Sequence, residues 1–66
     1  MLAEQRTEVI LKELTNRRIL SVADICKLTG ASEATIRRDL NTLDAQRKLR
    51  RVRGGAALIT PTRYDR

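Results

Sequence analysis

The sequence predicts a small, mainly helical domain in which three helices are followed by a β-hairpin. Apolar residues recur at the helical period in three separate stretches between residues 2 and 46. The second and third stretches are separated by a short turn that contains Gly30, which is the spacing of two helices in a helix-turn-helix. After the third stretch, two short strand-like segments flank Gly54-Gly55, a pair typical of tight hairpin turns.

The first helix is predicted over residues 3–14. Its apolar residues form one stripe that needs a partner surface: Leu2, Val9, Ile10 and Leu14. Glu8 and Lys12 form a favourable pair one turn apart on the polar side. The stretch 16–18 is expected to be a polar joint. Ile19-Leu20, which follows it, is a candidate short strand.

The second helix is predicted over residues 22–28, after Ser21, which can cap it. Asp24 stands three residues after this serine, as in a variant of the capping box. The apolar side of this helix consists of Val22, Ile25, Cys26 and Leu28. Gly30 suits the positive-φ position that follows a helix end, so the turn is expected at residues 29–31.

The third helix is predicted over residues 32–46, with Ser32 as its cap. One side of it is apolar and is interpreted only as core: Ile36, Leu40 and Leu43. Asp39 lies at the edge of that side, where it is expected to orient arginine side chains through a salt bridge. The packing side of this helix is therefore separate from the side that it presents outward.

The outward side of the third helix has residue types that recognise base edges. It combines small residues with arginine, asparagine and threonine, where a solvated helix usually carries Glu and Lys pairs. In a major groove, arginine pairs with guanine and asparagine with adenine, while alanine and threonine methyl groups contact thymine methyl groups. The expected base contacts are Ala34, Thr35, Arg38, Asn41 and Thr42. Three of these positions have other interpretations: a phosphate clamp for Arg38, a helix-start residue for Thr35 and a solvated position for Asn41.

Basic residues are concentrated in the second half of the chain, which has a net charge of +6. The stretch 37–53 holds seven basic and two acidic residues, whereas residues 1–24 hold four of each. This asymmetry predicts a surface for a polyanion, while a surface that only confers solubility usually mixes the two signs. The expected phosphate or minor-groove contacts are Ser32, Arg37, Arg50, Arg51, Arg53 and Gly54.

The hairpin is predicted from strands at residues 49–53 and 56–60, joined by Gly54-Gly55 and closed by Pro61. Four apolar residues of the hairpin are expected to cover the helices: Leu49, Val52, Leu58 and Ile59. Three helices followed by such a hairpin make up a winged helix-turn-helix.

A family resemblance rests on three parts of the sequence: residues 32–40, then Leu43, and then Leu49-Arg50-Arg51-Val52-Arg53-Gly54-Gly55-Ala56. They resemble the N-terminal DNA-binding domain of the DeoR family of bacterial transcriptional regulators, and the resemblance covers residues 4–57. It implies that residues 1–60 form a cytoplasmic winged helix-turn-helix that binds double-stranded operator DNA. Members of this family usually repress sugar or nucleoside catabolism.

The resemblance also implies that this chain is a piece of a longer protein, with residues 61–66 as the start of a linker. Full-length members carry a larger C-terminal domain that senses a phosphorylated sugar and forms oligomers. The domain itself is therefore expected to need no cofactor and to be monomeric when isolated.

Two positions depart from the family pattern. The family usually has histidine where Arg53 stands, and arginine keeps a donor there while adding a permanent charge. The family usually has glycine where Arg47 ends the third helix. If that position needs a positive φ, arginine there costs about 1 kcal/mol. Alternatively, the helix ends differently or the hairpin is set at a slightly different angle.

Other functions are disfavoured by the residue types that the chain contains. An enzyme is not expected, because the chain has no histidine, no Cys/His metal cluster and no Gly-rich phosphate loop. RNA recognition usually needs aromatic stacking platforms, and Tyr64 is the sole aromatic residue. No apolar run approaches transmembrane length, so no membrane partner is expected. A winged-helix module that docks onto proteins is the alternative to DNA binding.

Overall fold

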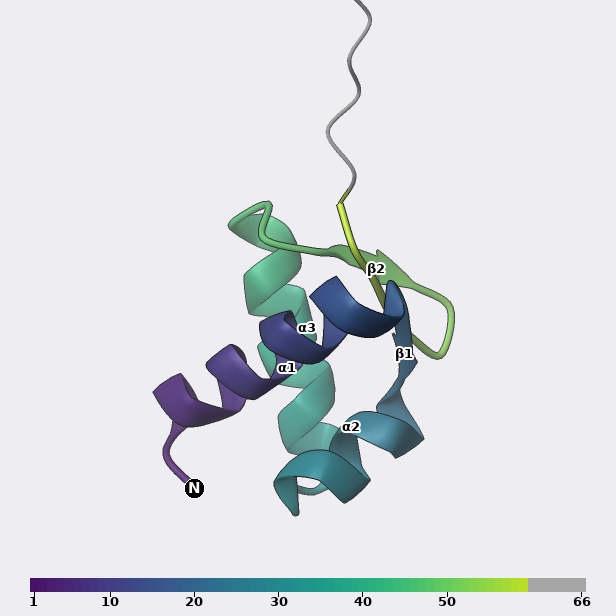
Figure 1. Cartoon of the computed structure of the whole chain (residues 1–66). Coiled ribbons are helices and arrows are strands. Elements are labelled where there is room, and N and C mark those ends of the chain that lie inside the picture. The colour runs from purple at the N-terminus through teal and green to yellow at the C-terminus, as the bar shows by residue number, and fades with distance from the viewer. Residues whose placement is uncertain (60–66) are drawn as a thin grey trace, which may run out of the picture.

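The computed structural model describes residues 1–59, which form three helices and three strands (Figure 1). The helices are α1 (Ala3–Arg17), α2 (Val22–Thr29) and α3 (Glu33–Ala45), and the strands are β1 (Ile19–Ser21), β2 (Arg50–Val52) and β3 (Gly55–Ala57). Within these residues the strands form one antiparallel sheet in the order β1-β3-β2. This arrangement confirms the predicted winged helix-turn-helix. The predicted linker at 61–66 lies outside the described residues.

Helix α1 is longer than the sequence pattern predicted, since it continues beyond Leu14 to Arg17. It ends where Arg18 adopts a left-handed conformation with φ 70°, and the N–H of Arg18 donates to the Leu14 carbonyl at 2.7 Å. No glycine marks this end, so the pattern placed it too early. Leu2 was also wrongly assigned to the apolar stripe. It precedes the helix and is 68% exposed, while Ile10 and Leu14 are buried.

Both predicted serine caps form. Ser21 Oγ accepts from the Asp24 N–H at 3.0 Å, and Ser32 Oγ accepts from the Thr35 N–H at 3.2 Å. Gly30 ends α2 with φ 75°, as predicted. Leu28 is 40% exposed, because the last turn of this short helix extends past the core, so its assignment to the apolar side was wrong.

The hairpin turns one residue earlier than predicted. Val52 pairs with Gly55, so the turn consists of Arg53 and Gly54, and only Gly54 has a positive φ, 75°. Gly55 is instead a buried residue of the central strand. A Cβ atom on it would overlap the carbonyl oxygen of Leu20 and lie 2.9 Å from the Cα of Ser21. Glycine is needed there because the backbones of β1 and β3 approach closely.

The predicted third strand forms at β1, where Leu20 pairs with Ala56 of β3. β3 is shorter than predicted, ending at Ala57, and the predicted strand end at residues 60–61 lies outside the described part of the chain. β1, which is the segment between α1 and α2, pairs with strand β3 of the hairpin. The sheet therefore fixes the hairpin relative to the helix-turn-helix.

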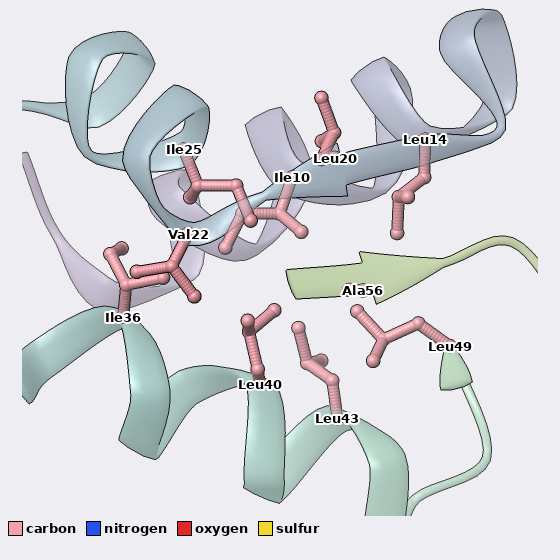
Figure 2. Packing of buried hydrophobic residues seen from close by; sticks show 10 residues of the cluster. All are labelled: Ile10, Leu14, Leu20, Val22, Ile25, Ile36, Leu40, Leu43, Leu49 and Ala56. Atoms are coloured by element: carbon pink, nitrogen blue, oxygen red, sulfur yellow. The ribbon is translucent and has the colours of Figure 1, made fainter. Parts of the chain in front are cut away.

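The core lies between α3 on one side and α1, α2 and the sheet on the other (Figure 2). Three side chains point into it from α3, as predicted: Ile36, Leu40 and Leu43. In the described part of the chain, the core consists of Ile10, Leu14, Leu20, Val22, Ile25, Ile36, Leu40, Leu43, Leu49 and Ala56. Packing on this side positions α3, and the opposite side of the helix makes no contact with the core.

Arg47 occupies the positive-φ position after α3, with φ 60°. Lys48 closes this turn by donating its N–H to the Leu43 carbonyl at 2.9 Å. Because a left-handed conformation is unfavourable for a residue with a Cβ, we expect Arg47→Gly to raise the free energy of unfolding by about 1 kcal/mol. Urea denaturation would measure the change. Lys48→Gly is the control and should lower stability, and equal effects at both positions would contradict this explanation.

Candidate nucleic-acid interface

Apart from Glu33, Thr35 and Arg37 near its start, the side chains of α3 that lie outside the core fall into three groups. Ala34, Arg38 and Ala45 are exposed on the side opposite the core. Asp39 and Thr42 face α1, and Asn41 and Asp44 face the hairpin, as their contacts show. The helix is thus held from its inner side and from both flanks.

On the first flank, Arg6 of α1 binds Asp39 through two hydrogen bonds. Its Nε donates to Oδ2 at 2.6 Å and its Nη2 donates to Oδ1 at 3.1 Å, with both side chains only 16% exposed. The hydrogen bond to Asp39 raises the pKa of the Arg6 guanidinium, so this group stays charged. The predicted salt bridge of Asp39 therefore forms, but its partner is an arginine of α1 that was not singled out in the sequence.

Thr42 lies on the same flank. It lines a surface cleft of about 530 Å³ together with Thr7 and Leu11 of α1. Asn41, the neighbouring residue in the sequence, instead contacts the hairpin. The structure thus separates two of the residues that the sequence grouped as base contacts.

On the second flank, Arg51 of β2 joins the hairpin to α3. Its Nε donates to Asn41 Oδ1 at 3.0 Å, and its Nη1 donates to the Gly55 carbonyl at 3.2 Å. The backbone N–H of Arg51 donates to Asp44 Oδ1 at 3.1 Å. Arg51 was predicted as a phosphate contact and Asn41 as a base contact, and the structure places these two side chains against each other.

The N-terminal end of α3 presents the next predicted contacts. Ser32 Oγ donates to Thr35 Oγ1 at 3.0 Å, which holds the threonine hydroxyl at the start of the helix. Arg37 pairs with Glu33 one turn earlier, at 2.6 Å between Nη2 and Oε2. Both of these charged side chains are exposed, and an exposed pair contributes little, so the pairing leaves Arg37 able to bind another anion.

Three further arginines are exposed: Arg38 on α3, Arg50 on β2 and Arg53 in the turn. Within residues 1–59 their side chains form no hydrogen bond or ion pair with the protein. The carbonyl of Gly54 accepts from the Val22 N–H at 2.8 Å, so the tip of the hairpin is attached to the start of α2. The hairpin turn is therefore held beside the helix-turn-helix.

Two further findings apply to residues 1–59. No group of three or more His, Cys, Asp or Glu side chains is placed to hold a metal ion. None of the helices in this range combines the length and the apolar character that crossing a membrane requires.

Comparison with known proteins identifies the family. A model of the DeoR-like helix-turn-helix domain matches residues 6–62. The chain belongs to this family. The match includes α2, the turn and α3, and it extends through the hairpin, so the DeoR-like resemblance seen in the sequence is confirmed.

Similar proteins are named as transcriptional regulators. This DeoR-like chain is 38% identical over 65 residues to the uncharacterized HTH-type transcriptional regulator FruR of Bacillus subtilis (strain 168), which covers 98% of this chain and 26% of the relative. It is 40% identical over 63 residues to the HTH-type transcriptional regulator UlaR of Shigella sonnei (strain Ss046), covering 96% of this chain and 25% of the relative. The chain thus spans about a quarter of the length of these relatives. No solved structure gives a significant match.

Two residues that position α3 and the hairpin of this DeoR-like chain were missed by sequence reasoning. Arg6 recurs at the helical spacing of the apolar stripe, but this spacing alone did not indicate that the arginine binds Asp39. Gly55 was noticed, but the Gly54-Gly55 pair was interpreted only as a turn. The close approach of Leu20 that requires this glycine comes from a strand more than thirty residues earlier in the chain.

Proposed function

We propose that this DeoR-like domain binds double-stranded operator DNA sequence-specifically, with α3 in the major groove. The observation that supports this is the division of α3 into a buried side, two flanks held by Arg6 and Arg51, and an outward side with Arg38 among small residues. Small residues allow a helix to enter the groove, which is about 12 Å wide and admits one helix. The β2–β3 turn then meets the backbone or the minor groove.

The proposed base contacts come from the outward side and its edges. Arg38 is central, with Ala34 and Thr35 toward the start of the helix and Asn41 toward the hairpin. Thr42 contributes from the α1 flank. The proposed phosphate contacts surround these residues: Ser32, Arg37, Arg50, Arg53 and Gly54. The backbone N–H groups at the start of α3 add the positive end of the helix dipole.

In the longer protein, we propose that this domain brings a regulator to its operator. The names of the relatives give transcriptional regulation as their role, and repression of a sugar or nucleoside pathway is the simplest form of it. Two copies would occupy two half-sites. A phosphorylated sugar would bind elsewhere in that protein, since the proposed interface uses the whole outward side of α3.

The test is a fluorescence-anisotropy titration of the domain with random duplex DNA at several salt concentrations, followed by recovery of the bound sequences. Enrichment of a short motif, with affinity falling steeply as salt rises, is the expected result. Salt-sensitive binding without enrichment would remove sequence recognition from the proposal. No binding at low salt would overturn the proposal in favour of a protein-docking module.

Arg38→Ala is expected to relax the selection at one base pair and to cost about 1–3 kcal/mol of binding free energy at the selected site. The reason is that Arg38 lies at the centre of the outward side of α3. The matched variant Arg50→Ala should weaken binding to all sequences alike and reduce the salt dependence by about one counterion. A uniform loss of affinity in both variants would contradict a base contact by Arg38.

A further inference from the structure

We infer that Arg51 determines which base Asn41 recognises, because its guanidinium is hydrogen-bonded to the oxygen of the Asn41 amide. This inference rests on the proposed function, in which α3 lies in the major groove. It assigns to Arg51 the role of a positioning residue for base recognition, acting through Asn41.

The geometry fixes the orientation of the Asn41 amide. Arg51 Nε lies 3.0 Å from Asn41 Oδ1. An arginine side chain has only N–H donors, so the group that faces it must be the amide oxygen, and the amide NH₂ must point elsewhere. An amide turned the other way would place two sets of donors against each other.

Besides its bond to Asn41, Arg51 is held in place at two points. Its Nη1 donates to the Gly55 carbonyl at 3.2 Å, and its backbone N–H donates to Asp44 Oδ1 at 3.1 Å. Asp44 lies one turn after Asn41 on the same flank of α3, so side chain and backbone of Arg51 are attached to the helix together. Arg51 is half-buried, whereas its neighbours Arg50 and Arg53 are exposed.

The engaged oxygen changes what Asn41 offers to a base. A free asparagine pairs bidentately with adenine, its oxygen accepting from N6 and its nitrogen donating to N7. Arg51 takes one of the two lone pairs of the oxygen, so one lone pair is left for a base, whereas the NH₂ group keeps both donors. The positive guanidinium beside Asn41 further favours a base that presents acceptors over one that presents a donor. Guanine presents two acceptors in the major groove, N7 and O6, and no donor. We therefore expect guanine in preference to adenine at the base pair that Asn41 contacts.

The experiment uses the full chain and the motif recovered from random DNA. The base pair that Asn41 contacts is the one at which Asn41→Ala loses selection. Binding is then measured for four duplexes that differ only at that pair, using the original chain and Arg51→Met. Methionine keeps an unbranched apolar stem and removes every donor. The expected result is a preference for guanine in the original chain and a shift of the guanine-to-adenine affinity ratio by about tenfold toward adenine in Arg51→Met.

Arg50→Met is the matched control, since it makes the same chemical change one residue earlier, at an exposed side chain. It should weaken all four duplexes equally and leave their ratio unchanged. Asn41→Asp is a second variant that keeps an acceptor for Arg51 but has no donor for DNA, so it should lose the guanine preference without disturbing Arg51. Circular dichroism melts of each variant establish that it is folded.

Three outcomes would overturn the inference. If Arg51→Met weakens all four duplexes equally, Arg51 is a phosphate contact, as the sequence suggested. If the original chain prefers adenine at this pair, the Asn41 oxygen is available, and DNA binding stands while the role of Arg51 falls. If the original chain binds no duplex at low salt, the proposed function fails and this inference fails with it.

Discussion

Gly55→Ala is expected to lower the free energy of unfolding of this domain strongly. The added Cβ would overlap the Leu20 carbonyl oxygen and lie 2.9 Å from the Cα of Ser21. Both are backbone atoms, so the clash is relieved only if β1 moves away from β3, the central strand of the sheet. Overpacking of this kind costs about 1–3 kcal/mol or more, a large share of the stability of a domain this small. Urea denaturation followed by circular dichroism would measure the loss.

Gly54→Ala is the matched control for this prediction. No atom lies within 4 Å of a Cβ at Gly54, so only its positive φ of 75° opposes the alanine. The expected loss is about 1 kcal/mol. If alanine at Gly54 were as destabilising as alanine at Gly55, the close approach of β1 to β3 would not be the reason for the glycine.

Leu40→Ala is expected to lower the free energy of unfolding by about 2–5 kcal/mol. Leu40 is fully buried at the centre of α3, between Ile36 and Leu43 on the same side of the helix (Figure 2). Truncating it leaves a cavity between α3 and the layer that it packs against. Because Arg38 and the outward side are untouched, the fraction that remains folded should bind DNA with unchanged affinity. Denaturation and anisotropy measured at the same temperature separate the two effects.

Leu28→Ala removes the same atoms from a leucine that is 40% exposed. We expect it to cost less than about 1 kcal/mol, because little buried surface is lost. An equal loss of stability at the two leucines would mean that the α3 core position contributes no more than a surface one.

Most elements of the fold were predictable because their signals are local. The caps at Ser21 and Ser32 each involve a backbone group three residues away, and Gly30 marks its own helix end. The inner side of α3 follows from its apolar spacing alone. The family pattern left open whether Arg47 keeps a positive φ, and the structure shows that it does.

The parts that were missed depend on contacts between distant segments. Arg6 and Asp39 are 33 residues apart, and nothing near either residue indicates the other. The interaction of Arg51 with Asn41 depends on how the hairpin folds back onto α3. The position of the turn depends on Leu20, since Gly55 is taken up by the close approach of β1 and leaves Arg53 and Gly54 to form the turn. Periodicity reports which side of an element is apolar, but not which neighbour covers it.

The bond from the Val22 N–H to the Gly54 carbonyl limits how this domain can diversify. Hairpin tips usually tolerate inserted residues, because they project into solvent. Here an insertion would carry the carbonyl away from α2 and leave the first N–H of that helix without its acceptor. Variation in loop length is thus disfavoured at this tip. Substitution of Arg53 changes only a side chain and leaves the bond to Val22 in place. A mutant library meant to alter the reach of the hairpin should therefore keep its length and vary that residue.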